Sequence, residues 1–192
     1  MRKKSLWLVY AVLCAVLLTS LPVYCADLRE KYTSLLEHLE LYQHEKLTAL
    51  KRHPENSLQP FTTDGCSGGM SVGWDYLANT IDRIKDIHGD QPPWEACCIN
   101  HDRAYHAAGP KNSPPEKSFQ NRKAADEQLR LCVLATGTTR SAVLSAAYHL
   151  STEEVESIYQ VIGDLMYHAV RLGGVPCTNL PWRWGYGWPE CE

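Results

Sequence analysis

The amino-acid sequence predicts an all-α fold held together by disulfides, and three observations lead to that prediction. Apolar side chains recur at steps of three and four residues along several stretches of the chain. No stretch shows the alternation of apolar and polar residues that is typical of strands. A segment with the form of a secretory leader precedes an even number of cysteines, which favours disulfides over free thiols.

Residues 1–25 have the form of a signal peptide. Three cations precede an apolar run from Leu6 to Leu21, which is shorter than a comfortable bilayer span. Val23 and Cys25 are small enough for cleavage before Ala26, although an uncleaved anchor and a lipid-modified Cys25 are alternatives. We therefore expect a secreted, extracellular protein, or one delivered to a periplasm or a lumen.

The remaining segment, 26–192, has the size of a single domain, and we expect its core at about 60–137. Without the three leader cations this segment carries 16 Lys and Arg against 22 Asp and Glu, a formal net charge of −6. That balance argues against a nucleic-acid partner, and against adsorption to anionic lipid by net charge alone. We expect a monomer. The six cysteines suit three bridges, with fifteen possible pairings: Cys66, Cys97, Cys98, Cys132, Cys177 and Cys191.

Six stretches of the chain predict helices. The first, 26–50, has an apolar stripe that we expect to face the core, and a glycine-rich loop follows at 64–69. The last helix opens at a capping box, Ser151 to Glu154, and ends at Gly173. The helices between them are expected at 74–87, 94–108, 117–136 and 139–149. The stripes comprise Leu28, Tyr32, Leu35, Leu39 and Tyr42 in the first helix, and Val155, Ile158, Ile162, Leu165 and Ala169 in the last.

The predicted helix at 94–108 places chemically active side chains on one face. Cys97, His101 and Tyr105 lie four residues apart and therefore share that face. Asp102 points about 100° away from His101. One helix thus presents a base and, next to it, a carboxylate.

The next predicted helix carries Asp126, six residues before Cys132. If the two helices are antiparallel and Cys97 bonds Cys132, His101 lies about 6 Å beyond the bridge and Asp126 about 9 Å along its own helix. The bridge would then bring His101 and Asp126 face to face. A carboxylate there accepts the proton of one imidazole nitrogen, so that the other nitrogen can take a proton from water.

Attack of water on a carbonyl group also requires positive charge where the oxyanion develops, and no Lys or Arg is an obvious candidate. Asp102, and Asp64 with the backbone carbonyls of the loop at 64–69, are hard oxygen donors, which calcium prefers. A bridge from Cys66 to Cys98 would pin this loop over the helix. We therefore expect Asp102 and the loop to hold Ca²⁺, which binds the carbonyl oxygen while the histidine activates water.

These residues also carry a resemblance to a known family. The run from Cys97 to Tyr105, Cys-Cys-Ile-Asn-His-Asp-Arg-Ala-Tyr, resembles the active-site helix of secreted phospholipases A2. Asp64-Gly65-Cys66-Ser67 is similar to the calcium loop of the bacterial and fungal-type members, and Asp126 stands where the family places its second catalytic acid. The resemblance extends over residues 64–69, 97–109 and 126–132.

The resemblance implies an enzyme that hydrolyses the sn-2 ester of glycerophospholipids with calcium, at a membrane or micelle surface. By this resemblance His101 is the general base, Asp126 orients it, and Tyr105 hydrogen-bonds Asp126. The implied calcium ligands are Asp102, Asp64 and the Gly65 carbonyl. The chain departs from the family where Ala124 and Ala125 replace two usual cysteines, and a second tyrosine supporting the acid is not identified.

Two other classes of protein stay open as alternatives. A non-catalytic phospholipase-like protein or toxin would use the same scaffold to bind a membrane or a receptor, although the joint presence of His101, Asp102 and Asp126 favours an enzyme. A zinc-stabilised module would use Cys97, Cys98 and His101 as ligands, although export favours disulfides.

The C-terminal segment 177–191 is rich in tryptophan. We expect its two end cysteines, Cys177 and Cys191, to close it as a loop. Because indole rings favour the membrane–water interface, Trp182, Trp184 and Trp188 are expected to dock the protein on lipid. The alternative is that these rings pack back on the body of the protein.

Overall fold

The computed structural model describes residues 31–66, 80 and 82–191. The chain divides into two compact units, Met1–Glu40 and Leu41–Glu192. The predicted leader lies outside the described residues, as do Ser67 to Gly69 of the glycine-rich loop and most of the helix predicted at 74–87. The prediction of one domain over 26–192 stays a prediction.

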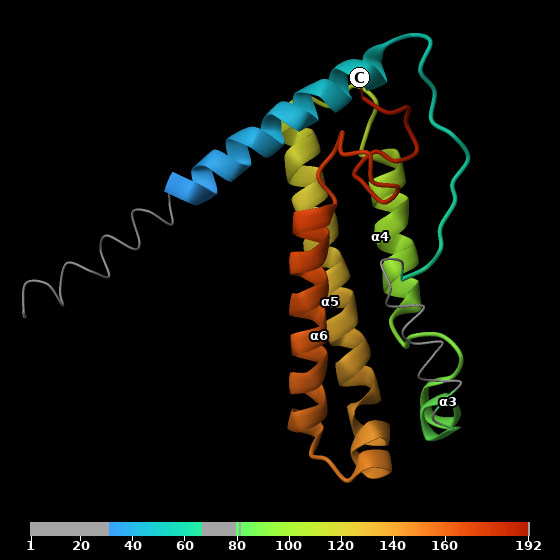
Figure 1. Cartoon of the computed structure of the whole chain (residues 1–192). Coiled ribbons are helices and arrows are strands. Elements are labelled where there is room, and N and C mark those ends of the chain that lie inside the picture. Colours follow the sequence, from blue (N-terminus) through green and yellow to red (C-terminus); the bar gives the residue numbers. More distant parts are fainter. Residues whose placement is uncertain (1–30, 67–79, 81, 192) are drawn as a thin grey trace, which may run out of the picture. The chain divides into compact units, whose positions relative to one another are not determined.

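Every regular element in the described ranges is a helix, so the predicted all-α class is confirmed. Residues 31–40 are helical in the first unit, and residues 41–52 are helical in the second. Across these ranges no helix combines the length and the apolar character that crossing a bilayer requires. The further helices of the second unit (Figure 1) are α3 (Asp82–His88), α4 (Glu95–Ala107), α5 (Pro115–Tyr148) and α6 (Thr152–Gly173).

Helix α5 is longer than the sequence pattern indicated, because the two helices predicted at 117–136 and 139–149 form one element. Gly137 lies between the two predicted ranges, and glycine weakens helices. In the structure a side chain at Gly137 would collide with the ring of Tyr159, which packs on it from α6. Gly137 therefore serves the close approach of two helices and does not end one.

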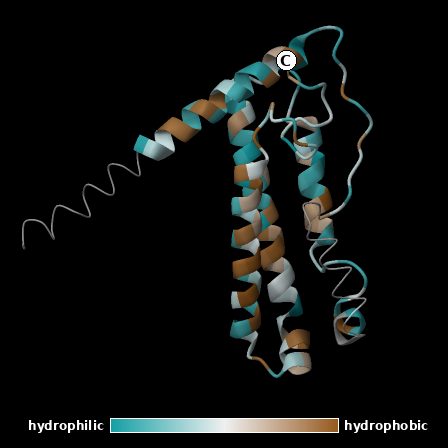
Figure 2. Cartoon of the chain, in the orientation of Figure 1, coloured by the Kyte–Doolittle hydropathy of each residue, from teal (hydrophilic) through white to brown (hydrophobic). Residues whose placement is uncertain are grey.

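Helices α5 and α6 form a tightly packed antiparallel pair, linked by residues 149–151. The predicted capping box at Ser151 and Glu154 opens α6. Figure 2 shows hydrophobic residues recurring along both helices. The buried face of α6 is offset from the predicted stripe, in which Ile158 and Leu165 are exposed. It consists of Val155, Tyr159, Gly163 and Met166.

Three disulfides join the segments of the second unit. Cys97–Cys132 links α4 to α5, and Cys66–Cys98 attaches the chain before α3 to the start of α4. Cys177–Cys191 closes the C-terminal segment. These are the pairings considered from the sequence, and they favour an extracellular or otherwise oxidising compartment.

Within the second unit, the expectation that the apolar stripe of the N-terminal helix faces the core is wrong, because Tyr42 is exposed. Tyr32, Leu35 and Leu39 of the stripe belong to the first unit. The buried face lies in residues 41–52 and is largely polar, so hydrophobic periodicity does not reveal it. This face consists of His44, Leu47, Thr48 and Lys51.

The tryptophan-rich segment packs against the C-terminal end of α4. The Trp184 indole is only 1% exposed and donates to the Ser118 hydroxyl at 3.0 Å. The Trp188 indole is also buried and donates to the Ala107 carbonyl at 3.0 Å. Burial of both rings does not fit the expected interfacial role for these two tryptophans. Trp182, 42% exposed, is the one of the three that lies at the surface.

Candidate functional site

The predicted pairing of His101 with Asp126 is present in the structure. His101 lies on α4 four residues after Cys97, and Asp126 lies on α5 six residues before Cys132. The disulfide fixes the antiparallel register of the two helices, and His101 Nε2 lies 2.9 Å from Asp126 Oδ1. Both side chains are buried.

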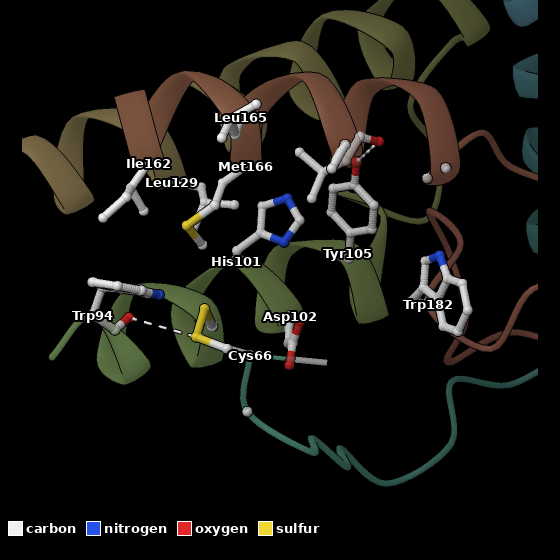
Figure 3. A pocket seen from close by; sticks show the side chains of 16 residues that line it. Cys66, Trp94, His101, Asp102, Tyr105, Leu129, Ile162, Leu165, Met166 and Trp182 are labelled. Carbon is white, nitrogen blue, oxygen red and sulfur yellow. Dashed lines mark hydrogen bonds between the residues drawn. A yellow bond between two sulfur atoms is a disulfide. The ribbon is translucent and has the colours of Figure 1, made fainter. Parts of the chain in front are cut away.

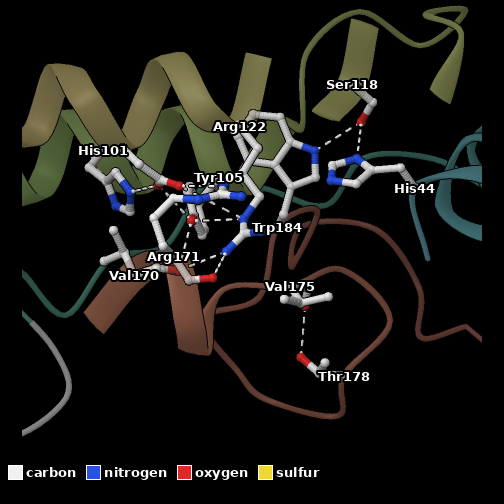
Figure 4. A network of polar contacts seen from close by, with 11 residues as sticks. His44, His101, Tyr105, Ser118, Arg122, Val170, Arg171, Val175, Thr178 and Trp184 are labelled. Carbon is white, nitrogen blue, oxygen red and sulfur yellow. Dashed lines mark hydrogen bonds and ion pairs between the residues drawn. The ribbon is translucent and has the colours of Figure 1, made fainter. Parts of the chain in front are cut away.

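Asp126 is wholly buried, and its carboxylate is held by side chains of α4, α5 and α6. Figure 4 shows the side chains of His101, Tyr105, Arg122 and Arg171 close together. Oδ1 of Asp126 also accepts from the Tyr105 hydroxyl of α4, at 2.7 Å. Its Oδ2 accepts from Nη1 of Arg171 on α6, at 2.9 Å. The Nε atom of Arg122 on α5 lies 4.0 Å from the same oxygen. A buried carboxylate requires such partners, because its desolvation is costly otherwise.

Tyr105 acts as a hydrogen-bond donor in this cluster. Burial raises the pKa of Tyr105 far above its ordinary value, and the neighbouring Asp126 carboxylate raises it further. The phenol therefore stays protonated and donates a hydrogen bond to Asp126. Nε of Arg122 donates in turn to the phenol oxygen, at 3.1 Å.

The second imidazole nitrogen of His101 is left for chemistry. When Nε2 carries the proton shared with Asp126, Nδ1 has a free lone pair. Among the described residues no hydrogen bond engages Nδ1 of His101. The ring lines a cavity of about 650 Å³. A water molecule in that cavity could be deprotonated by Nδ1.

The cavity lies between α4 and α6 and is mainly apolar (Figure 3). His101 and Asp102 stand on its α4 wall, and Trp94 and Trp182 lie toward opposite ends of it in this view. The walls also present several aliphatic and thioether groups. These come from Leu129, Ile162, Leu165, Met166, Ala169 and Val170.

Asp102 marks the second part of the candidate site. Its Oδ2 accepts from the Thr63 hydroxyl at 2.5 Å, and the Gly65 amide donates to that hydroxyl at 3.0 Å. Burial raises the pKa of Asp102, and the carboxylates of Asp64 and Glu95 raise it further, while Thr63 lowers it. Asp64, Gly65 and Asp102 thus lie in one region of the second unit.

The carboxylates of Asp64, Glu95 and Asp102 lie near one another in this region. One oxygen of Glu95, Oε2, is buried without a hydrogen-bond partner, and the Glu95 carboxylate fills the space that a side chain at Gly65 would occupy. Asp64, Glu95 and Asp102 have no Lys or Arg ion-pair partner among the described residues. A cation at this place would offset their mutual repulsion.

The carboxylate side chains of this region would not be sufficient to hold a cation. In the described part of the chain no group of three or more His, Cys, Asp or Glu side chains is arranged to hold a metal. A calcium ion takes six to eight oxygen ligands, and backbone carbonyls supply several of them in many sites. The residues that would hold it are Asp102, Asp64 and the Gly65 carbonyl.

The zinc alternative does not fit the structure. Zinc requires thiolates as sulfur ligands. Cys97 and Cys98 are both consumed in disulfides, and His101 Nε2 is engaged by Asp126.

Sequence reasoning missed the two arginines and Glu95. Arg122 stands four residues before Asp126 on one helix, which is a spacing that could have identified it. Arg171 is 45 residues from Asp126, and no spacing rule connects them. Glu95 was visible as an acid in the first turn of a helix, where the helix dipole is an ordinary explanation.

Comparisons with known proteins give no relative, because no family model, no curated protein and no solved structure matches the chain.

Proposed function

We propose that this protein is a calcium-dependent lipid esterase of the phospholipase A2 type, which releases fatty acid from the sn-2 position of glycerophospholipids. The observation that carries the proposal is the position of His101. Its Nε2 lies 2.9 Å from the buried Asp126, and its ring lines an apolar cavity of about 650 Å³. Hydrolysis of an acyl ester requires a base whose tautomer is fixed and an apolar cavity that binds the acyl chain.

In the proposed reaction, Nδ1 of His101 takes a proton from water as the water oxygen attacks the ester carbonyl carbon. Asp126 stabilises the imidazolium that forms, and the Tyr105 hydroxyl holds Asp126 in place. The imidazolium then returns its proton to the leaving alcohol, so the base is regenerated. Calcium, when bound by Asp102, Asp64 and the Gly65 carbonyl, supplies positive charge for the developing oxyanion.

The lining of the cavity supports an acyl chain as the bound group. Its walls are mainly apolar, and burial of each methylene group of a substrate contributes about 0.8 kcal/mol. The polar groups His101 and Asp102 are confined to the α4 wall, where the ester would react. A small polar ester would leave most of the apolar walls uncovered.

The exposed face of α6 supports a lipid surface as the partner. Leu165 and Trp182 line the cavity and are also exposed, so the apolar lining continues onto the surface. On α6 a row of exposed apolar side chains runs along the same face, at helical spacing. This row consists of Ile158, Val161, Leu165 and Leu172.

The test measures release of fatty acid from phospholipid vesicles in calcium. It is repeated with EGTA, which removes calcium, and with His101→Gln, which removes the base. The matched control is His168→Gln, because His168 is an exposed histidine on α6. We expect EGTA and His101→Gln each to abolish release and His168→Gln to leave it unchanged. Release that persists both with EGTA and in His101→Gln contradicts the proposal. Vesicle binding without any release favours the non-catalytic alternative.

A further inference from the structure

We propose that Arg171, in the last turn of α6, is a positioning residue that fixes the Asp126 carboxylate and thereby the His101 ring. The catalytic consequence of this inference rests on the proposed function. Its structural basis does not: Oδ1 of Asp126 is hydrogen-bonded from α4, and Oδ2 is hydrogen-bonded from α6.

The two oxygens of Asp126 have separate partners. Oδ1 accepts from His101 Nε2 at 2.9 Å and from the Tyr105 hydroxyl at 2.7 Å, both on α4. Oδ2 accepts from Arg171 Nη1 at 2.9 Å. A carboxylate held by one oxygen can turn about its Cβ–Cγ bond, whereas a partner on each oxygen sets the plane of the group. Arg171 therefore keeps Oδ1 directed at the imidazole.

The backbone that carries Arg171 is itself held. Nη2 of Arg122 donates to the carbonyl oxygens of Val170 and Arg171, at 2.8 and 2.7 Å. These carbonyls belong to the last turn of α6, and the Val170 carbonyl also accepts from the amide of Gly174, the residue after the helix. The same Arg122 bonds the Tyr105 hydroxyl, so the end of α6 and the Asp126 cluster are fixed together.

The charges in the cluster agree with this role. The wholly buried Asp126 has two guanidinium groups within 4.0 Å of Oδ2, one from α5 and one from α6. Removing a single partner from a buried charge is costly, because the charge remains in the protein interior without compensation. Asp102 is a further charged group beside His101, and it lines the cavity.

A merely structural role for Arg171 is the competing explanation, since it also ties α6 to α5. The chain offers a matched control in Arg130 on α5, whose Nε lies 2.5 Å from Asp164 Oδ1 on α6. This ion pair joins the same two helices but does not touch Asp126. Loss of the Arg130 pair thus reports the effect of weakening the helix pair alone.

The experiment compares kcat and KM for fatty-acid release by Arg171→Met, Arg171→Lys and Arg130→Met, at saturating calcium. We expect Arg171→Met to lower kcat on the order of 10- to 100-fold with little change in KM. Arg171→Lys should restore part of kcat, and Arg130→Met should leave it unchanged. Equal losses in Arg171→Met and Arg130→Met, or no loss in Arg171→Met, would overturn the inference.

A second readout separates this inference from the proposed function. At one fixed pH, ¹⁵N NMR reports which nitrogen of His101 carries the proton, with the signal assigned by its loss in His101→Gln. We expect the proton on Nε2 in the wild type and in Arg171→Lys, and a mixture of tautomers in Arg171→Met. An unchanged tautomer in Arg171→Met overturns the inference, whereas a wild type without hydrolysis overturns only the function. If Arg171→Met does not fold, Arg171→Gln replaces it with the same direction of change expected.

Discussion

The ammonium group of Lys51 lies 2.6 Å from the carbonyl oxygen of Ala108, immediately after the end of α4. The same group donates to three further carbonyl oxygens of that turn. The lysine side chain is wholly buried. Residues 41–52 thus close the C-terminal end of the helix that carries His101. The further acceptors are the carbonyls of Ala107, Gly109 and Pro110.

Replacing Lys51 by methionine should destabilise the fold. The change keeps most of the buried volume but leaves buried carbonyl groups without their donor, at a cost of about 1 to 3 kcal/mol. Urea unfolding at pH 7 measures the difference. Lys46→Met, in the same helix but only partly buried, is the control and should change the free energy of unfolding by less than about 0.5 kcal/mol. Equal effects of the two changes would contradict this role.

The contribution of Lys51 should also depend on pH. Burial lowers the pKa of Lys51 from 10.5 to about 8. Between these two values the unfolded chain binds a proton that the folded chain does not, so the free energy of unfolding rises with pH. The difference between the wild type and Lys51→Met should therefore grow from pH 8 to pH 10.5. A difference that shrinks over this range would show that burial does not disfavour the ammonium form.

Calcium should stabilise the protein through Asp102. A ligand that binds only the folded state at one hundred times its Kd stabilises by about 2.7 kcal/mol, which raises Tm. We expect this shift in the wild type, and we expect Asp102→Asn to lose most of it because one charged oxygen ligand is removed. Asp86→Asn, at an exposed acid of α3, is the control and should keep the full shift. Thermal unfolding of the wild type and of the two variants, with calcium and with magnesium, measures the shift in Tm.

Chain-length preference should follow the size of the cavity. Ile162 lines the cavity, whereas its neighbour Val161 is exposed and does not. Ile162→Trp should lower kcat/KM for long acyl chains on the order of 10-fold while sparing short ones, because the added ring takes up room that a long chain needs. Val161→Trp should leave the preference unchanged. Assays with a series of acyl lengths decide, and a uniform loss over all lengths would contradict the assignment of the cavity to the acyl chain.

Binding to lipid should depend on the exposed side of α6. Leu172 is 85% exposed, and transfer of a whole leucine side chain from water to an apolar phase contributes about 1.5 to 3 kcal/mol. Leu172→Asp should therefore weaken binding to zwitterionic vesicles on the order of 10-fold. Val143→Asp, at an exposed apolar residue of α5, is the control and should bind as the wild type does. Vesicle sedimentation measures both variants, and equal binding by all three proteins would exclude α6 as the docking face.

The part of the site that could be predicted from sequence is the part set by helix geometry. The four-residue spacing of Cys97, His101 and Tyr105 places them on one face, and one disulfide then sets the register against Asp126. The all-α class follows from periodicity in the same way. These features depend on neighbours in the sequence or on one covalent link, so the sequence contains their signal.

The features that could not be predicted depend on contacts between distant segments. Arg171 reaches Asp126 from another helix, and Lys51 reaches the end of α4 from 57 residues away, measured to Ala108. The tryptophan-rich segment could pack or face lipid with the same residues, and only its contacts show that Trp184 is buried. Polar anchors of this kind leave no trace in a hydrophobic pattern, because that pattern records only apolar burial.

The most direct test of the proposed function is the rate of sn-2 fatty-acid release by Asp126→Asn relative to the wild type, at equal calcium loading. Asparagine keeps the shape of the side chain but removes the charge that stabilises the imidazolium of His101. We predict rapid sn-2 release by the wild type and a loss on the order of 1,000-fold or more in the variant, measured at a temperature at which both proteins are folded. Equal rates in the two proteins, or no sn-2 release by the wild type, would contradict the account.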